Sequence, residues 1–123
     1  MKGHESKLPE ERPLSDAECG LVRWLLEHGT ASAHNYLSQV PRLRVESRCR
    51  CGCASINFTQ PFRPAGDVLS EYQWHDAAGH LNGIFVRASG GELAGLDLWS
   101  IDGASTPVGL SAPNQLRPLD EIT

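Results

Sequence analysis

The sequence has no apolar stretch that approaches the roughly 20 residues a helix needs to cross a bilayer. The N-terminal stretch from Met1 to Lys7 also lacks the apolar run found in secretion signals. These two absences predict a cytoplasmic protein that does not enter a membrane. In such a reducing compartment, the four cysteines are expected to be thiols rather than disulfides.

Motifs of the common enzyme classes are missing as well. The chain contains no G-x-G-x-x-G, no P-loop, no G-x-S-x-G and no H-E-x-x-H. Its histidines show no metal-binding spacing among themselves. No catalytic residue is therefore predicted; whether the protein is an enzyme stays open, and a non-enzymatic role is favoured.

Composition predicts one small domain with an acidic surface. The chain has 123 residues, a mass of 13.4 kDa and 40% hydrophobic residues, enough for a single core. A formal net charge of −4 argues against nucleic acid as a partner. Residues 1–13 are rich in charge and contain two prolines, so we expect a flexible N-terminal arm followed by a single domain over 14–123.

Two helices are expected at the start of that domain. Ser15 and Glu18 fit a capping box, which predicts a first helix over 16–28 with Gly29 as its left-handed C-terminal cap. A shorter helix is expected to follow, capped by Thr30 or Ser32 and ending near Gln39, because Pro41 cannot continue it.

After the second helix the hydrophobic period changes from about 3.6 to 2, which indicates strands. An antiparallel meander of about five strands is expected, at 43–50, 55–59, 68–75, 84–89 and 92–101. The predicted fold class is therefore α+β, with two N-terminal helices packed on an antiparallel sheet.

The Gly90-Gly91 pair predicts a two-residue hairpin turn. Regular pairing from this turn places Asp97 opposite Ile84, with Trp99 on the same face, and makes both faces of the sheet largely apolar. A carboxylate at position 97 would then need an arginine or a backbone N–H as partner, or would contact a ligand.

A sheet that is apolar on both faces needs two covers, and the two helices supply one. The second cover is expected from the segment after Gly103, which contains several apolar residues, or from a second subunit or another partner.

Residues 43–53 predict a strand with thiols on one side and charge on the other. Alternate residues of a strand lie about 6.6 Å apart, whereas two sulfurs on one zinc ion are about 3.8 Å apart. Buried thiols are therefore favoured, and a metal site would need a turn at Gly52. That alternative would join Cys49, Cys51, Cys53 and His75, or His80 in place of His75. A redox-active thiol is a further alternative for the same cysteines.

Four arginines form a local basic strip in this otherwise acidic chain. We define the basic strip as Arg42, Arg44, Arg48 and Arg50. One reading is a charged strand that is protected against aggregation. The other is a docking site for an acidic partner.

The order of several sequence features resembles small bacterial proteins of unknown function. The features are the capped helix ending in His28-Gly29, the run from Arg48 to Ser55, the run from Gly91 to Leu98, and Asp102-Gly103. The resemblance implies a bacterial cytoplasmic protein. Because several comparable small α+β families neutralise toxins, it also implies an immunity-like role.

We therefore expect a non-enzymatic protein-interaction domain, either immunity-like or self-associating as a homodimer, with no cofactor. The expected partner-binding residues are Arg44, Arg48, Arg50, Asp97 and Trp99. The alternative is a metal-binding or thiol-redox protein that holds zinc at the cysteine cluster.

Overall fold

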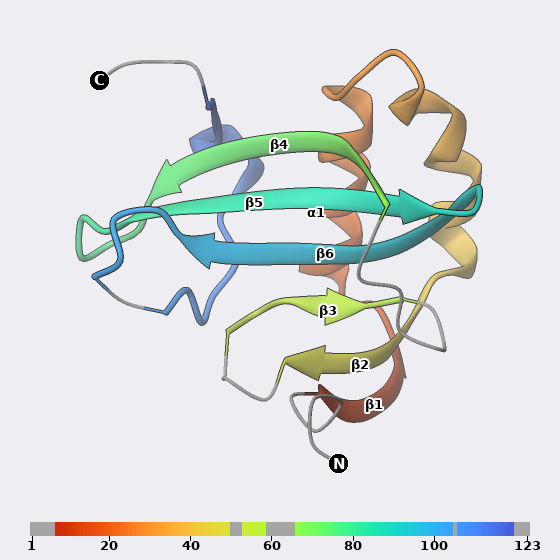
Figure 1. Ribbon diagram of the computed structural model, residues 1–123, viewed down its shortest axis with the longest axis horizontal. Helices are drawn as coiled ribbons and strands as arrows, with labels where there is room; N and C mark the ends of the chain where they lie inside the picture. The colour runs from red at the N-terminus through yellow and green to blue at the C-terminus, as the bar shows by residue number, and fades with distance from the viewer. Residues whose placement is uncertain (1–6, 50–52, 59–65, 105, 120–123) are drawn as a thin grey trace.

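The computed structural model describes residues 7–49, 53–58, 66–104 and 106–119. They form an α+β fold in which a helical layer packs on an antiparallel sheet (Figure 1). The helices are α1 (Asp16–Glu27) and two 3-10 helices, η2 (Ala33–Arg42) and η3 (Pro113–Gln115). The strands are β1 (Lys7–Pro13), β2 (Arg44–Cys49), β3 (Ile56–Asn57), β4 (Asp67–His75), β5 (Leu81–Ser89), β6 (Glu92–Ser100) and β7 (Arg117–Pro118).

Within the described ranges the sheet has seven strands, two more than expected, in the order β1-β2-β3-β6-β5-β4-β7. It is not the simple meander that the sequence predicts, because β3 pairs with β6 rather than with β4. The two additional strands occupy its margins. One of them, β1, lies in the segment expected to be a flexible arm, and it pairs with β2 along most of its length.

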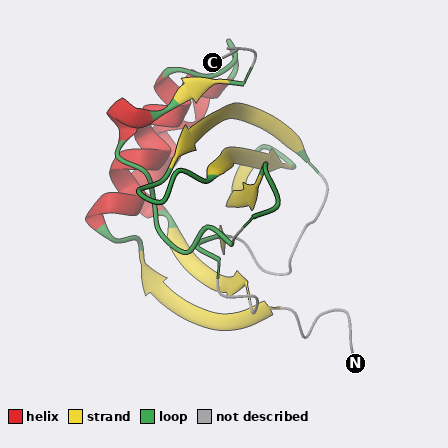
Figure 2. Ribbon diagram, turned by 90° about the vertical axis from the view of Figure 1, so that its left-hand side faces the viewer, coloured by secondary structure: helices red, strands yellow, loops and turns green. Residues whose placement is uncertain are grey.

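Helix α1 begins as the sequence predicts, with a complete capping box. The Glu18 backbone N–H donates to Ser15 Oγ at 3.1 Å, and the Ser15 N–H donates to Glu18 Oε1 at 2.9 Å. The helix lies behind β4, β5 and β6 in Figure 1, and Figure 2 shows the helices together on one side of the curved strands. Its inward residues are fully buried: Leu21, Val22, Leu25 and Leu26.

The expected role of Gly29 is wrong. The C-cap residue is His28, and Gly29 is not among the glycines with positive φ. A side chain at position 29 would instead clash with the carbonyl oxygen of Leu69. Glycine is required here because the chain after α1 passes close to β4.

The side chain of Gln39, on η2, holds the hairpin between β5 and β6. Its Nε2 donates to the carbonyl oxygen of Gly91 at 3.0 Å, and its Oε1 accepts from the N–H of Leu93 at 2.9 Å. The side-chain amide therefore satisfies one backbone acceptor and one backbone donor of the hairpin. Both turn glycines, Gly90 and Gly91, have the positive φ expected of them.

The predicted pairing of β5 with β6 is right at the turn and wrong beyond it. Ser89 faces Glu92 and Ala88 faces Leu93, but an irregularity between Arg87 and Ala88 then shifts the register. One extra residue on β6 reverses the parity of everything that follows. Ile84 consequently pairs with Leu98, and Asp97 and Trp99 lie on the opposite face.

This correction changes the character of both faces. Leu96 and Leu98, expected on the same face as Phe85, are instead buried with Ile84 and Val86 in the core beneath the helices. The uncovered face contains polar and aromatic residues instead.

The C-terminal segment was expected to cover that second face, but its described part belongs to the helical side. Leu116 is buried in the same core as α1, and Leu110 packs against it. The chain then forms β7, whose Pro118 carbonyl accepts a 2.8 Å hydrogen bond from Gln73 Nε2 on β4. Residues 120–123 lie outside the described residues.

Candidate functional site

The candidate site is the face of the sheet opposite α1, which we call the helix-free face because none of the described helices packs on it. Side chains that pair across an antiparallel ladder point to the same face. Residues on this face are therefore Asn57, Gly83, Phe85, Arg87, Gly95, Asp97 and Trp99.

Arg87 is the centre of a polar network on this face. Its side chain is 7% exposed, and its Nε donates to Asp97 Oδ2 at 2.7 Å. One terminal nitrogen donates to Asn57 Oδ1 at 2.7 Å, and the Asn57 amide in turn donates to Ser47 Oγ at 3.1 Å. A buried guanidinium is costly unless it is paired in this way. The network therefore connects β2, β3, β5 and β6.

Two glycines make room for the large side chains of this face. A side chain at Gly95 would stand 2.7 Å from a terminal nitrogen of Arg87, and one at Gly83 would clash with the indole of Trp99. Each glycine is the cross-strand partner of the residue that covers it. The guanidinium and the indole consequently lie flat over the sheet rather than extending from it.

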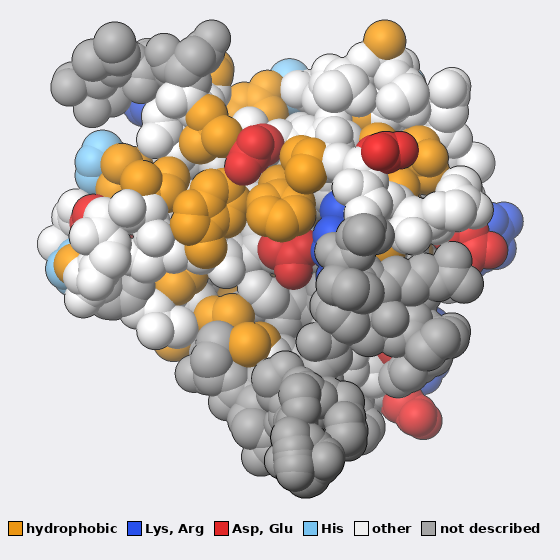
Figure 3. Space-filling model, viewed as in Figure 1, with side chains coloured by type: hydrophobic (Ala, Val, Ile, Leu, Met, Phe, Trp, Pro, Cys, Tyr) orange, Lys and Arg blue, Asp and Glu red, His pale blue; other side chains and the backbone are white. Residues whose placement is uncertain are grey.

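The aromatic part of the face is accessible to a partner. The rings of Phe85 and Trp99 are 5.5 Å apart at an angle of 57°, and both residues are only partly buried. Val68, which pairs with Arg87 across β4 and β5, is 46% exposed. Figure 3 shows hydrophobic side chains gathered over the middle of this face, with acidic and basic side chains beside them.

Sequence reasoning identified Asp97 and Trp99 but missed Arg87 and Asn57. The predicted register places Arg87 opposite Ala94 and on the other face from Asp97. The signal that was available is Gly95, because a glycine inside a strand often marks a bulge or a close approach. Asp97 does have an arginine as partner, which was one of the two expectations for it.

The basic strip lies apart from this network. Arg44 and Arg48 are exposed on β2, while the alternate residues Val45 and Ser47 are buried, as the predicted alternation requires. Arg44 donates to the carbonyl oxygen of Glu11 on β1 at 3.2 Å. Arg50 lies outside the described residues.

The proposed metal ligands are not brought together in the described part of the chain. Cys49 and Cys53 are partly buried, and Cys51 is not among the described residues. His75 ends β4, and three strands lie between β4 and the strand of Cys49. Among the residues the structure describes, no three His, Cys, Asp or Glu side chains are grouped to hold a metal ion.

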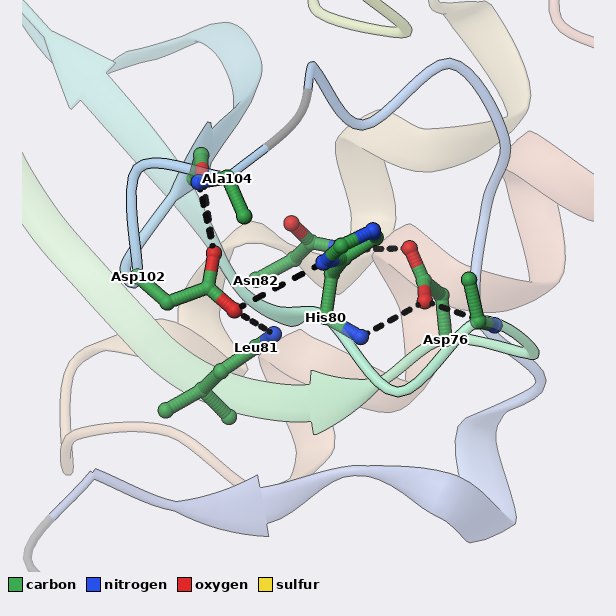
Figure 4. A network of polar contacts seen from close by, with 8 residues as sticks. Asp76, His80, Leu81, Asn82, Asp102 and Ala104 are labelled. Atoms are coloured by element: carbon green, nitrogen blue, oxygen red, sulfur yellow. Dashed lines mark hydrogen bonds and ion pairs between the residues drawn. The ribbon is translucent and has the colours of Figure 1, made fainter.

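A second polar cluster surrounds His80 in the turn between β4 and β5 (Figure 4). Asp76 accepts hydrogen bonds from the backbone N–H groups of Ala78 and His80 at 3.0 and 2.9 Å. Asp102 accepts from the backbone N–H of Leu81 at 2.8 Å, and its Oδ2 lies 3.9 Å from His80 Nδ1. The imidazole therefore lies near the carboxylates of Asp76 and Asp102, and each carboxylate also accepts backbone hydrogen bonds.

Backbone hydrogen bonds lower the pKa of both carboxyl groups. The His80 N–H contributes most to the lowered pKa of Asp76, and the Leu81 N–H contributes most to that of Asp102. Both groups are therefore ionised at neutral pH and keep their capping roles. Sequence reasoning considered His80 only as a metal ligand and assigned Asp76 no role.

No family model, no curated protein and no solved structure matches this chain. The resemblance to small bacterial proteins therefore stays a prediction.

In the part of the chain that the structure describes, no helix is both long and apolar enough to span a membrane.

Proposed function

We propose that this protein is a non-enzymatic binding domain that holds a protein partner on its helix-free face. The observation that carries the proposal is the partly exposed pair of Phe85 and Trp99, which lies beside the ion pair of Arg87 and Asp97. Aromatic and arginine residues on a rigid support are typical of the positions that contribute most binding energy to interfaces.

The charges near the aromatic pair favour a basic and apolar partner surface. Glu71 on β4 lies opposite Phe85 and adds a negative charge beside it. Arg87 already balances Asp97, and the whole chain has a formal net charge of −4. A lysine or arginine of the partner, next to an apolar group, would complement this arrangement. An immunity-like role, in which the partner is a toxin, is one form of this function.

The basic strip supports a second candidate, the docking of an acidic partner. Arg44 and Arg48 extend from the same side of β2 and are exposed. This candidate is weaker because exposed charges on their own contribute little affinity. The zinc and thiol-redox alternative has less support, since no group of three candidate ligands is found among the residues that the structure describes.

Photo-crosslinking from defined positions would test the proposal. The photoreactive residue p-benzoylphenylalanine would replace Val68 on the helix-free face, Arg48 in the basic strip, or Val108. Val108 is a suitable control because it is 73% exposed in the C-terminal segment. We expect one protein to be captured repeatedly from position 68 and not from position 108. Capture only from position 48 would favour the basic strip and contradict the proposal.

The purified partner would then be titrated against surface variants that preserve the fold. Glu71→Lys should weaken binding by about tenfold, because it places a positive charge against a basic surface. Glu27→Lys, at the exposed end of α1, is the matched control and should leave the affinity unchanged. Equal affinity of both variants would contradict the assignment of this face. Sedimentation of the chain alone would show whether the partner is a second copy.

A further inference from the structure

A cavity of about 500 Å³ lies where β4 turns into β5, away from the helix-free face. One wall contains Trp74 and Asn82, which pair across the two strands and point to the same side as the core. The opposite wall is formed by the C-terminal segment, including Pro107 and Leu110. This volume is within the range of small-molecule sites.

The C-terminal wall is held in place by the rest of the fold. The carbonyl oxygen of Pro107 accepts a 3.0 Å hydrogen bond from the N–H of Ala54, near the start of β3. Leu110 packs against the buried core that α1 shares. The cavity therefore has two anchored walls.

Asn82 provides a hydrogen-bond acceptor that is not used. The residue is 1% exposed, and its Nδ2 donates to Asp76 Oδ2 at 3.2 Å, which fixes the orientation of the amide. Figure 4 shows the amide oxygen turned away from Asp76. This Oδ1 is buried and has no hydrogen-bond partner among the described residues. Buried acceptors without a donor are uncommon and destabilising, which points to a missing donor.

Asp76 adds a fixed negative charge to the same wall. Its Oδ1 accepts from two backbone N–H groups, while its Oδ2 accepts from the Asn82 amide. A carboxylate can accept about four hydrogen bonds, so Oδ2 retains capacity for another donor. The site thus offers a carboxylate and an amide oxygen beside an apolar wall.

We propose that this cavity binds a small organic cation. Ammonium N–H groups of the ligand donate to Asp76 and, after a small shift of the cavity wall that uncovers it, to the buried Oδ1 of Asn82. The apolar part of the ligand lies against Trp74, Pro107 and Leu110. An anion is excluded by the carboxylate. A neutral hydroxyl compound of the same shape supplies one donor without the charge and binds more weakly.

The test compares two probes of nearly the same shape, phenethylamine and 2-phenylethanol, in titrations followed by NMR. The side-chain amide of Asn82 and the indole N–H of Trp74 report on the cavity. We expect saturable shifts of both signals with phenethylamine, and at least about tenfold weaker binding of the alcohol. Equal binding of the two probes, or no saturable shift up to about 10 mM amine, would overturn the proposal.

A pair of variants separates the cavity from the neighbouring turn. Asp76→Asn removes the charge and keeps an oxygen that accepts from the backbone, so it should weaken phenethylamine binding by at least about tenfold. Asp102→Asn removes the other carboxylate beside His80. Because Asp102 does not line the cavity, this variant should bind phenethylamine as the unmodified protein does. Equal loss in both variants would overturn the proposal. The comparison of probes on the unmodified protein remains decisive if either variant folds poorly.

Discussion

The indole of Trp99 lies over the α-carbon of Gly83, in the space that a side chain at position 83 would fill. The two residues are cross-strand partners on β6 and β5. The absence of a side chain at one position thus determines the orientation of the ring at the other. It also keeps the ring within contact of Phe85.

Gly83→Ala should therefore destabilise the fold. The added methyl group would displace the indole, and an overpacked site of this kind costs about 1–3 kcal/mol of unfolding free energy. Urea unfolding followed by tryptophan fluorescence would measure it. Gly20→Ala is the matched control, because Gly20 is exposed in α1 with no atoms near the new methyl group. That control should gain about 0.5–1 kcal/mol from better helix propensity, and equal stability of the two variants would contradict the packing argument.

Arg87→Met should remove the donor that both Asp97 and Asn57 use. Because Asp97 is 27% exposed and regains some hydration, we expect a loss of about 2–3 kcal/mol rather than the full cost of an isolated buried charge. Denaturant unfolding would measure this loss. Arg23→Met, at an exposed position of α1, should change stability by less than about 0.5 kcal/mol. A double variant with Asp97→Leu should recover part of the loss, since no unpaired charge then remains.

Gln39→Ala should loosen the hairpin between β5 and β6. The substitution leaves the N–H of buried Leu93 without its acceptor, which costs about 1–3 kcal/mol. Amide hydrogen exchange at Leu93 should become faster, and this measurement locates the effect. Ser38→Ala, at the exposed neighbouring position, should leave that exchange rate unchanged. Unchanged protection of Leu93 in Gln39→Ala would show that the turn glycines alone hold the hairpin.

The free energy of unfolding should decrease when the solution is acidified, because Glu18 becomes protonated. The Arg12 guanidinium, whose nitrogens lie 2.8 Å from the carboxylate oxygens, lowers the pKa of Glu18 below its ordinary value of 4.5. A lowered folded-state pKa means that the stabilisation is complete above pH 4.5 and is lost as the pH falls through the folded-state value. Because Arg12 is 35% exposed and solvent screens the pair, the contribution is about 1 kcal/mol.

Glu18→Gln tests this pH dependence directly. Free energies of unfolding measured between about pH 3 and pH 6 should vary less in this variant than in the unmodified protein. Glu27→Gln, an exposed acid in the same helix, should keep the original slope. An unchanged slope in Glu18→Gln would assign the acid sensitivity to other groups.

Local chemistry made part of this fold predictable. The side chains of Ser15 and Glu18 each accept a hydrogen bond from the other residue's backbone N–H. Four consecutive residues are therefore enough to predict where α1 begins. The turn at Gly90-Gly91 is equally local, because both positions require positive φ. The α+β class and the positions of the longer strands follow from such signals.

The remaining features depend on contacts that no short window contains. A single extra residue on β6, next to the hairpin, places Asp97 beside Arg87 rather than opposite Ile84, as expected. Residues 7–13 form a strand only because β2 offers them an edge, and their charge gave no such indication. The Arg87 network is therefore not predicted as a unit, although the sequence singles out its member Asp97 and the nearby Trp99.

The two outermost strands of the sheet, β1 and β7, both end in proline, at Pro13 and Pro118. Proline has no N–H, so each margin contains a position that cannot donate a hydrogen bond to a strand from another molecule. Growth by adding strands edge to edge is thus disfavoured on either side. Partner recognition by this protein should therefore depend on side-chain contacts rather than on the addition of a strand to the sheet edge. Concentrated solutions of the protein should also resist fibril formation.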